Sequence, residues 1–481
     1  MSRRLLSRAS RYRPLPLVLL AVVSVLSFAA RIAWLGMPCH SPCHSANDRV
    51  LVFDESYYVN AARVIAGLPP PPNENYADAR LGDDPNAEHP QLAKLLIAGS
   101  IELLGDKPIG WRLTALVLGT AAILGMYALA RAAGAGAWLA LGAASLMAAD
   151  NLLLVHGRIA TLDVPVAAAM IWAAVAYLRG RLLLAGVIVG VGTAIKLVAP
   201  YVLLVFAALE LFRHFGRGDV RPGADAQPGG DPRPGVVAAR PGERGPTWLR
   251  GRAVTRLGAC TVVSAGVFVG LLASLDRIAP PYDGASAKLL ASGPFHHIAR
   301  MLSYGADETS PHGPTGIASY PWTWLVDVKP ITYLNINPAR PAPGIYDVHP
   351  AVHFLGMISP SIMLLAIPGL LFSAWTIGRR KPVRRAPVGE GGDGAAGRFA
   401  SGDVPMLAVS WFLGTFLPFV VLSLAFQRTS YIYYMVIVMP GIYLAVADLV
   451  IRGRRFWKMI ALWVVLVVGA AIVMYPLTPL P

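Results

Sequence analysis

Two adjacent carboxylates, Asp54 and Glu55, stand in the segment Val52–Tyr58. They follow the end of the first long apolar run by about 20 residues, beyond one membrane crossing. Side chains of neighbouring residues point in different directions, so one carboxylate can face a reaction centre while the other pairs with a cation. A carboxylate placed in this way can act as a general base on a hydroxyl group. The competing interpretation is a solvated charge pair that begins a helix, because Asp is a common N-cap residue.

Further ionisable and aromatic residues stand at or near the ends of later apolar runs. Arg, Lys and His side chains near the headgroup level can hold a lipid phosphate and stabilise it as a leaving group. For each residue alone, a snorkelling anchor or a structural hydrogen bond is the simpler explanation. As a set on one side of a membrane, together with the acid pair, they favour chemistry. The set is Asp54, Glu55, His89, Lys94, Arg112, His156, Arg158, Asp163, Lys196, His296, His297, Arg300, His312, Lys329, Arg428, Tyr431 and Tyr433.

The composition indicates what kind of scaffold positions these residues. Of the 481 residues, 55% are hydrophobic and 14% are charged, and the mean hydropathy is +0.53. Soluble proteins usually carry about 25% charged residues, so this composition is typical of an integral membrane protein with many spans. The net charge of +15 comes from basic residues that gather between apolar runs, as the positive-inside rule expects. This distribution argues against nucleic acid as the partner of the basic residues.

Ten apolar runs predict an all-α polytopic membrane protein with about eleven transmembrane helices. One long run, from Leu182 to Phe212, exceeds one ordinary helix and is divided near Lys196 and Pro200 into the fifth and sixth spans. With eleven spans, the basic N-terminus and every Arg-rich loop are cytoplasmic, and two long loops are extracytoplasmic. The predicted spans are residues 15–35, 111–129, 137–154, 162–178, the two halves of 182–212, 253–275, 352–377, 406–426, 431–450 and 459–475.

The same pattern divides the chain into three parts. Residues 1–212 form an N-terminal transmembrane part that holds spans one to six and a first external loop at 36–109. Residues 213–252 are rich in Pro, Gly and Arg, and we expect them to form a disordered cytoplasmic linker. Residues 253–481 form a C-terminal transmembrane part with spans seven to eleven and a second external loop at 276–350.

The first external loop carries two further local patterns. The stretch from Pro90 to Leu104 has helical periodicity but is short for a span, so we expect it in the membrane interface. The segment Cys39–His44 holds two cysteines and two histidines, which could form a small disulfide or bind a metal. Its spacing matches no standard zinc signature, which favours a local staple or no role. Cys260 falls inside an apolar run and is expected to be inert packing.

Several motifs together resemble the protein O-mannosyltransferase family, which are membrane glycosyltransferases of the GT-C type. The resemblance covers most of the chain, and it depends on the order of the motifs relative to the spans. The motifs are Phe53-Asp54-Glu55, His89-Pro90 with Lys94, Gly110-Trp111-Arg112-Leu113, Arg158-Ile159-Ala160-Thr161-Leu162-Asp163, Tyr320-Pro321-Trp322-Thr323-Trp324, Lys329-Pro330 and Arg428-Thr429-Ser430-Tyr431-Ile432-Tyr433-Tyr434. Two departures are visible. The family's His-Pro-Pro-Leu-Gly-Lys is His89-Pro90-Gln91-Leu92-Ala93-Lys94 here, and residues 276–350 are too few for the extra lumenal domain of eukaryotic members.

The resemblance implies an eleven-span fold and a polyprenyl- or dolichyl-phosphate-mannose donor. It implies inverting transfer of mannose to Ser or Thr hydroxyls of exported proteins at the outer face of the cell membrane, with the secretion translocon as a candidate partner. By this resemblance Asp54 is the catalytic base and Glu55 supports it. Arg112 and Arg158 hold either the acid pair or the donor phosphate by this resemblance. Residues assigned to the donor phosphate or lipid are Arg112, Arg158, Lys94, His89, Arg428 and Tyr433. Residues assigned to the sugar or the acceptor are Asp163, Trp322 and Trp324.

Other interpretations stay open. A related transferase could move another sugar, such as aminoarabinose or arabinose, to a lipid or glycan with the same acid and phosphate-binding residues. A secondary transporter places ionisable groups near the bilayer midplane and has repeated halves, whereas these groups lie at span ends. A lipid-binding scaffold without catalysis is a further alternative, which the acid pair disfavours. Asp54 and Glu55 could ligate one Mg²⁺ or Mn²⁺, although the other ligands are not evident in the sequence.

Overall fold

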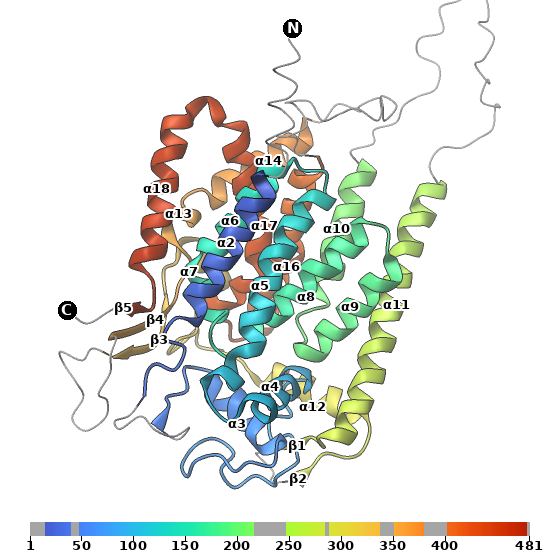
Figure 1. The fold of residues 1–481 in the computed structure, drawn as a ribbon. Helices are drawn as coiled ribbons and strands as arrows, with labels where there is room; N and C mark the ends of the chain where they lie inside the picture. Colours follow the sequence, from blue (N-terminus) through green and yellow to red (C-terminus); the bar gives the residue numbers. More distant parts are fainter. Residues whose placement is uncertain are drawn as a thin grey trace, which may run out of the picture.

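The computed structural model describes residues 15–39, 48–215, 247–283, 288–336, 351–379 and 402–478. Most of these residues are helical, and the long helices run side by side as a bundle (Figure 1). A helix stands in each predicted span. These helices are α2 (Leu15–Ile32), α5 (Pro108–Ala132), α6 (Ala137–Ala149), α8 (Asp163–Leu178), α9 (Leu182–Ile195), α10 (Tyr201–Phe215), α11 (Thr247–Ile278), α14 (Ala366–Gly378), α16 (Val404–Phe426), α17 (Met435–Arg452) and α18 (Trp457–Val473).

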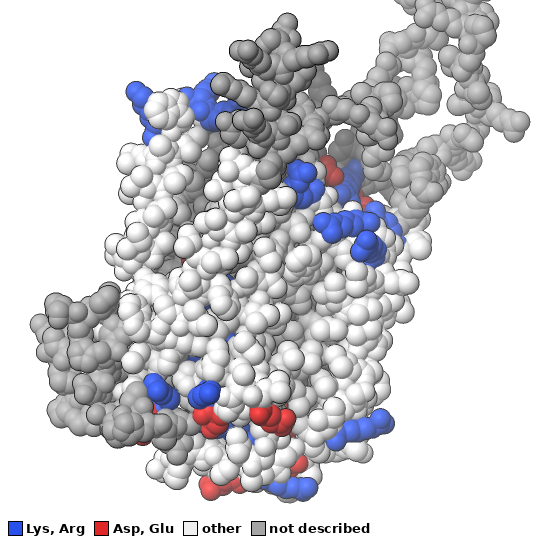
Figure 2. Space-filling view, in the orientation of Figure 1, with Lys and Arg blue, Asp and Glu red and all other residues white. Residues whose placement is uncertain are grey.

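The described part of the chain contains 7 helical stretches that are long and apolar enough to cross a membrane. Shorter apolar helices, α6, α8 and α9, stand beside them. Figure 2 shows a broad uncharged belt around the bundle on the face in view, with Lys and Arg at the end where α17 passes into α18. A belt of this kind matches the apolar core of a bilayer. The chain is therefore a multi-pass membrane protein, and eleven crossings stay a prediction.

Short elements cover the opposite end of the bundle (Figure 1). They come from the two predicted external loops and include α3 (Glu55–Ile65), α4 (Leu92–Leu104), α12 (Pro294–Asp307) and an antiparallel pair, β1 (Tyr282–Asp283) with β2 (Lys288–Leu289). The helix predicted from Pro90 to Leu104 is confirmed as α4. The two loops thus form a folded cap over one end of the bundle.

A three-stranded antiparallel sheet in the order β3-β4-β5 was not predicted. It consists of β3 (Ile331–Ile336), β4 (Ala351–Gly356) and β5 (Leu477–Thr478). The predicted eighth span, which began at Val352, is wrong at its start because β4 occupies that segment. The burial of β4 alternates along the strand, as one side of a sheet requires. Pro360 then opens the helix α13 (Pro360–Met363), a position that suits proline.

The predicted third span is interrupted after α6. A separate short helix, α7 (Asn151–His156), begins there, and the Asp150 carboxylate caps it by accepting the Leu152 N–H at 3.3 Å. Asp150 also accepts the Ser359 N–H at 2.9 Å and the Tyr443 hydroxyl. One carboxylate therefore ties the start of α7 to the segment after β4 and to α17, and this is why the apolar run does not continue as one helix.

Helices occupy both ends of the predicted linker at 213–252. α10 continues to Phe215 and α11 begins at Thr247, so residues 216–246 lie outside the described residues. Arg213 is part of the fold, because its guanidinium lies 3.3 Å from Glu210 and 3.2 Å from Asp403. Residues 284–287 and 337–350 of the second loop are also outside the described part.

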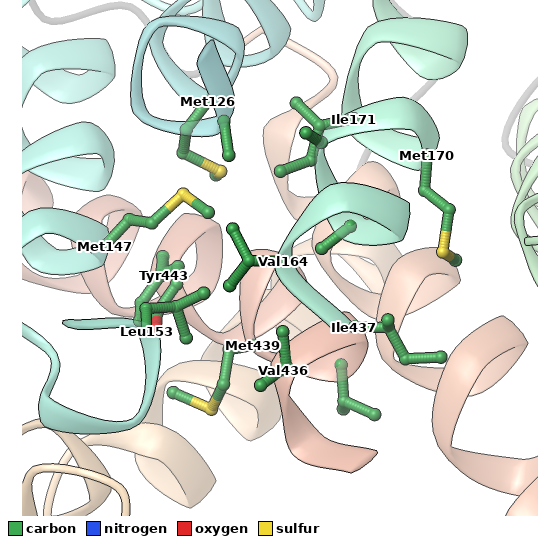
Figure 3. Packing of buried hydrophobic residues seen from close by; sticks show 14 of the residues in the cluster. Met126, Met147, Leu153, Val164, Met170, Ile171, Val436, Ile437, Met439 and Tyr443 are labelled. Atoms are coloured by element: carbon green, nitrogen blue, oxygen red, sulfur yellow. The ribbon is translucent and has the colours of Figure 1, made fainter. Parts of the chain in front are cut away.

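The core lies where α5, α6, α8 and α17 meet. α17 is apolar on all sides and buried from Met435 to Asp448, which is the pattern of a central helix. Figure 3 shows Met126, Met147 and Val164 converging on this centre with residues of α17. Flexible methionine side chains fill irregular gaps between such helices. The packed centre gives the cap a rigid base.

α11 packs along α9 through two glycines spaced four residues apart. A Cβ atom at Gly186 would lie 2.8 Å from the Cys260 carbonyl oxygen, and one at Gly190 would lie 2.7 Å from the Ser264 carbonyl oxygen. Small residues in this spacing let two membrane helices approach closely. The glycines of α9 therefore fix the position of α11 at the edge of the bundle.

Gly190→Ala is expected to lower the stability of the purified protein by about 1–3 kcal/mol, because the methyl group must push α11 outward. Thermal unfolding in detergent measures the change. Gly266→Ala in α11 is the matched control, since a Cβ there meets nothing within 4 Å. Equal losses at both positions would contradict close packing between α9 and α11.

Candidate active site

Asp54 lines a cavity of about 370 Å³ at the capped end of the bundle. Six segments of the chain form its wall. They are the start of α3, the rest of the first loop up to His89, Lys196 between α9 and α10, the end of α12 with Glu308, Ile317, and the segment from Arg428 to Tyr434. The charged residues of the wall are Asp54, Glu88, Lys196, Glu308 and Arg428. The wall thus combines carboxylates, cationic side chains and several tyrosines around one small cavity.

Asp54 occupies the N-cap position of α3, but its side chain makes no capping hydrogen bond. Burial raises the pKa of Asp54 to about 7, helped by the nearby Asp163 and opposed by Lys196. A carboxylate with such a pKa is a suitable proton acceptor near neutral pH. The preceding Phe53 has a φ of 56°, which is costly for a bulky residue and typical of functional sites. Its ring stacks on Tyr333 with centroids 4.1 Å apart.

Glu55 points away from this cavity into the protein. Its Oε1 accepts hydrogen bonds from Arg112 Nε at 2.7 Å and the Ala160 N–H at 2.7 Å. Its Oε2 accepts from Arg112 Nη2 at 2.6 Å and the Val52 N–H at 2.8 Å. Both oxygens are occupied and the side chain is fully buried. Glu55 and Arg112 therefore anchor the start of α3, and with it the backbone that carries Asp54.

Arg158 and Lys94 were expected at the donor phosphate, but neither lines the cavity. Arg158 donates to the Ala33 carbonyl at 2.8 Å and to the Tyr475 hydroxyl at 3.3 Å. Lys94 is fully buried, with its Nζ 2.6 Å from Asp84 Oδ2. The same Nζ donates to the His89 carbonyl at 2.9 Å. Lys94 thus supports the loop that carries His89, and its contact with a donor stays a prediction.

Lys196 and Arg428 bring positive charge to the cavity wall. Lys196 donates to Asp163 Oδ1 at 2.6 Å and lies 5.5 Å from the centre of the Tyr433 ring. Arg428 follows the end of α16, where Gln427 has a φ of 52°. Among the described residues, Arg428 Nη1 is buried without a hydrogen-bond partner. An unsatisfied buried donor of this kind is rare, and an anion such as a phosphate would satisfy it.

His89 lies in the cavity wall between two tyrosines. Its ring centre is 5.7 Å from that of Tyr58 and 6.1 Å from that of Tyr304. Burial, and then the charges of Lys196, Lys94 and Arg428, hold the pKa of His89 well below its usual range. The imidazole is therefore neutral at pH 7. It can form hydrogen bonds with a ligand in the cavity, but it contributes no positive charge.

The three residues expected at the sugar or acceptor lie outside the cavity wall. Asp163 pairs with Lys196. Trp324 is buried, and its Nε1 donates to Ser319 Oγ at 2.9 Å. Trp322 is 43% exposed and stacks on Tyr320 with ring centroids 4.5 Å apart. Contact of these residues with a sugar or an acceptor stays a prediction.

His156 is a buried structural histidine. Its Nε2 lies 2.8 Å from the Tyr333 hydroxyl and its Nδ1 lies 3.2 Å from Thr161 Oγ1. Burial lowers the pKa of His156 to about 4, so the ring is neutral beside Asp163. It supports Tyr333, on which Phe53 stacks.

Sequence reasoning gave no role to several residues of the wall. Two of these had a sign in the sequence that could have found them. Lys196 is a polar residue at a span end, and Tyr57-Tyr58 follow the acid pair after one serine. The wall residues from α12 and from the loop before His89 had no such sign, because contacts between loops bring them to the cavity. The wall residues without a predicted role are Tyr57, Tyr58, Tyr76, Asn86, Glu88, Lys196, Tyr304, Glu308, Ile317, Thr429, Tyr431 and Tyr434.

The arrangement does not offer a shared cation site to the acid pair, because Glu55 is occupied by Arg112 and backbone N–H groups. Within the described ranges, no group of three or more His, Cys, Asp or Glu side chains is placed to hold a metal ion. Cys39 is disulfide-bonded, while residues 40–47, with the rest of the Cys39–His44 cluster, lie outside the described part. Cys260 is free and buried, as expected.

Comparisons with known proteins agree with this picture. A family model described as dolichyl-phosphate-mannose-protein mannosyltransferase matches residues 88–218. A polyprenol-phosphate-mannose–protein mannosyltransferase of Corynebacterium glutamicum is 24% identical over 398 residues, which cover 73% of this chain and 68% of the relative.

Solved structures share the fold. The protein O-mannosyltransferase Pmt1-Pmt2 complex of S. cerevisiae, bound to its sugar donor, matches 96% of this chain and 89% of its own chain, with a TM-score of 0.62 and 12% identity. An oligosaccharyltransferase of Archaeoglobus fulgidus matches 97% of this chain and 56% of its own, with a TM-score of 0.50 and 13% identity. Taken together, the family match over residues 88–218, the bacterial relative and the shared fold show that this chain is similar, in sequence and in fold, to the protein O-mannosyltransferases, which are membrane glycosyltransferases.

Proposed function

We propose that this protein transfers mannose from a polyprenyl-phosphate-mannose donor to Ser or Thr hydroxyls of exported proteins. The observation that carries the proposal is the cavity that holds Asp54 together with Lys196 and Arg428. A carboxylate with a raised pKa can accept the hydroxyl proton. Two cations in the same wall can neutralise a departing lipid phosphate. The matched relatives are named for this donor and this reaction class.

In the proposed reaction, a single in-line displacement inverts the anomeric centre. The acceptor oxygen forms a bond to C1 of mannose while the bond from C1 to the phosphate oxygen breaks. The hydroxyl proton passes to Asp54. The polyprenyl phosphate leaves with the electron pair of the broken bond, and Lys196 and the unsatisfied Nη1 of Arg428 balance its charge. Phosphate is a good leaving group, so charge neutralisation matters more than proton donation to it.

The other expected residues take positioning or wall roles in this proposal. Glu55 and Arg112 hold the backbone of Asp54, and Lys94 holds the loop of His89. Arg158 packs between α2 and the segment after α18. Asp163 orients Lys196, and Tyr433 lines the phosphate end beneath the Lys196 ammonium. We assign a wall role to side chains that line the cavity. We assign a positioning role to side chains whose hydrogen bonds are all made inside the protein.

We place the capped end of the bundle on the extracytoplasmic side and the N-terminus in the cytoplasm. The support is the charge distribution: Arg131, Arg213 and Arg452 end helices at the face away from the cap, as the positive-inside rule expects. In this orientation the cavity faces exported acceptors, and a translocon in the same membrane would deliver them unfolded.

The direct test is transfer of labelled mannose from polyprenyl-phosphate mannose to a Ser/Thr-rich peptide by the purified full chain in proteoliposomes. Transfer with the mannose donor, and none with the matched arabinose or aminoarabinose donors, is the expected result. Transfer only from a pentose donor would replace mannose in the proposal. No transfer from any lipid-phosphate sugar, with the protein folded, would overturn it.

The rate of transfer is expected to depend on pH through Asp54. A general base works only when deprotonated, and the raised pKa of about 7 means that kcat/KM falls tenfold per pH unit well below pH 7. The donor is a phosphodiester and stays ionised over this range. Initial rates in proteoliposomes between pH 5 and 8.5 measure the profile. A flat profile down to pH 5 would contradict a carboxylate with a raised pKa as the base.

A further inference from the structure

We propose that Glu88 and Tyr76 form the subsite that binds the hydroxyl groups of the donor sugar and so decide which sugar is transferred. This inference rests on the proposed function and deepens it. Both residues line the cavity that contains Asp54. Neither belongs to a motif that suggested the reaction, and Glu88 stands beside His89.

A chain of hydrogen bonds orients the two groups. Asn86 is 5% exposed, and its Nδ2 donates to the Tyr76 hydroxyl oxygen at 3.0 Å and to Glu88 Oε2 at 3.2 Å. Because the Tyr76 oxygen accepts from Asn86, its own proton can be donated to a ligand. Glu88 Oε1 receives one long contact of 3.5 Å from Arg300 among the described residues, so this carboxylate keeps lone pairs for a ligand.

Contacts inside the protein hold the loop that carries these groups. Lys94 Nζ donates to the Asn86 carbonyl at 2.5 Å and pairs with Asp84 inside the protein. The Tyr76 ring contacts Tyr57 edge to face with centroids 6.5 Å apart, and Tyr57 lies in the first turn after Asp54. The subsite is therefore fixed relative to Asp54 by the cap itself.

The charged residues of the wall indicate where the phosphate and the sugar of the donor bind. A phosphate is repelled by the Glu88 carboxylate and attracted by Lys196 and Arg428, so it belongs to the basic part of the wall. A sugar hydroxyl both donates and accepts, and a carboxylate beside a phenol offers it one acceptor and one donor. Tyr57 and Tyr76 add aromatic surface for the apolar face of a sugar ring. A neutral hexose next to an ionised phosphate matches this distribution.

The test compares Glu88→Gln with wild type on polyprenyl-phosphate mannose and on donors in which single ring hydroxyls are replaced by hydrogen. In wild type, removal of the hydroxyl bound by Glu88 is expected to lower kcat/KM for the donor about 10–100-fold, the range for a hydrogen bond to a charged group. Glu88→Gln is expected to lower kcat/KM for the parent donor by a similar factor. In Glu88→Gln, removal of that same hydroxyl from the donor should lower kcat/KM little further. The decreases in kcat/KM caused by removing the other hydroxyls should be the same as in wild type.

A merely structural role of Glu88 predicts a different pattern, in which Glu88→Gln slows every donor by the same factor and leaves the deoxy penalties as in wild type. That result would overturn the subsite, and so would a change confined to the KM for the peptide, which would place the acceptor there. Tyr76→Phe removes one hydroxyl and provides a second variant with the same readout if Glu88→Gln fails to fold. Glu102→Gln, at an exposed position on α4, is the matched control and should behave as wild type.

The two proposals fail in distinguishable ways. If wild type transfers no mannose from any donor, the proposed function falls and this subsite falls with it. If wild type transfers mannose but neither Glu88→Gln nor Tyr76→Phe changes the deoxy penalties, the subsite alone is wrong.

Discussion

Asp54→Asn is expected to reduce kcat for mannose transfer by about 10²–10⁴-fold, the usual contribution of a positioned general base. Asn has the size of Asp but cannot take the proton of the acceptor hydroxyl. The side chain of Asp54 makes no capping hydrogen bond to α3, so the substitution leaves the helix start intact. The measurement is the initial rate of transfer from polyprenyl-phosphate mannose to a Ser/Thr-rich peptide at saturating concentrations of both.

Asp78→Asn is the matched control, because Asp78 lies exposed in the same loop. It should transfer mannose at the wild-type rate. Binding of the donor should persist in Asp54→Asn, since Lys196 and Arg428 are unchanged. Wild-type activity of Asp54→Asn would remove Asp54 as the base, and the next candidate in the cavity wall would then be Glu308 rather than Glu55, whose oxygens are occupied.

Arg112→Gln is expected to lower the free energy of unfolding by about 3–5 kcal/mol, because it leaves the Glu55 carboxylate buried without its cation. Arg112 is 2% exposed and donates to both carboxylate oxygens of Glu55 and to the Leu35 carbonyl. The loss should appear as a lower unfolding midpoint of the purified protein in detergent. Activity should fall as well, because α3 begins at Glu55 directly after Asp54.

The double variant Glu55→Gln/Arg112→Gln tests the cause of that loss. It removes the uncompensated charge, so it should recover part of the stability that Arg112→Gln loses. Arg179→Gln, at an exposed position just after α8, removes the same positive charge without breaking a buried pair, and it should change stability by no more than about 0.5 kcal/mol. Equal midpoints for Arg112→Gln and Arg179→Gln would show that the Glu55–Arg112 pair does not anchor the fold.

The helices could be predicted from the sequence because the bilayer requires each span to be apolar and internally hydrogen-bonded. That requirement is local, so α5, α16 and α17 stand within a few residues of their predicted positions. The division at Lys196 and Pro200 was also predictable, since one run could not form a single helix of ordinary length. β4 was not predictable in the same way, because an apolar segment of strand length can extend a helix or pair with another strand, and its partners β3 and β5 lie elsewhere in the chain.

The acid pair was recognisable from the sequence, and so was the prospect that one member would pair with a cation. Which member does so was decided by tertiary contacts, because Arg112 and the Ala160 N–H converge on Glu55 from other segments. Tertiary contacts also decide the partner of Lys94. Its place in the motif predicts a ligand contact, which stays a prediction, and its Nζ pairs with the buried Asp84 in the structure.

By itself the sequence determined a membrane-spanning helical protein with a carboxylate pair beyond the first span and basic residues between spans. These properties depend on residue type and on short-range spacing. Only the tertiary structure decided that Asp54, Lys196, Arg428 and Glu88 share one cavity, because the folding of two external loops over one end of the bundle brings them together. A loop-to-loop contact has no period and no local signal in the sequence, and that is the physical reason why the wall of the cavity had to be seen in three dimensions.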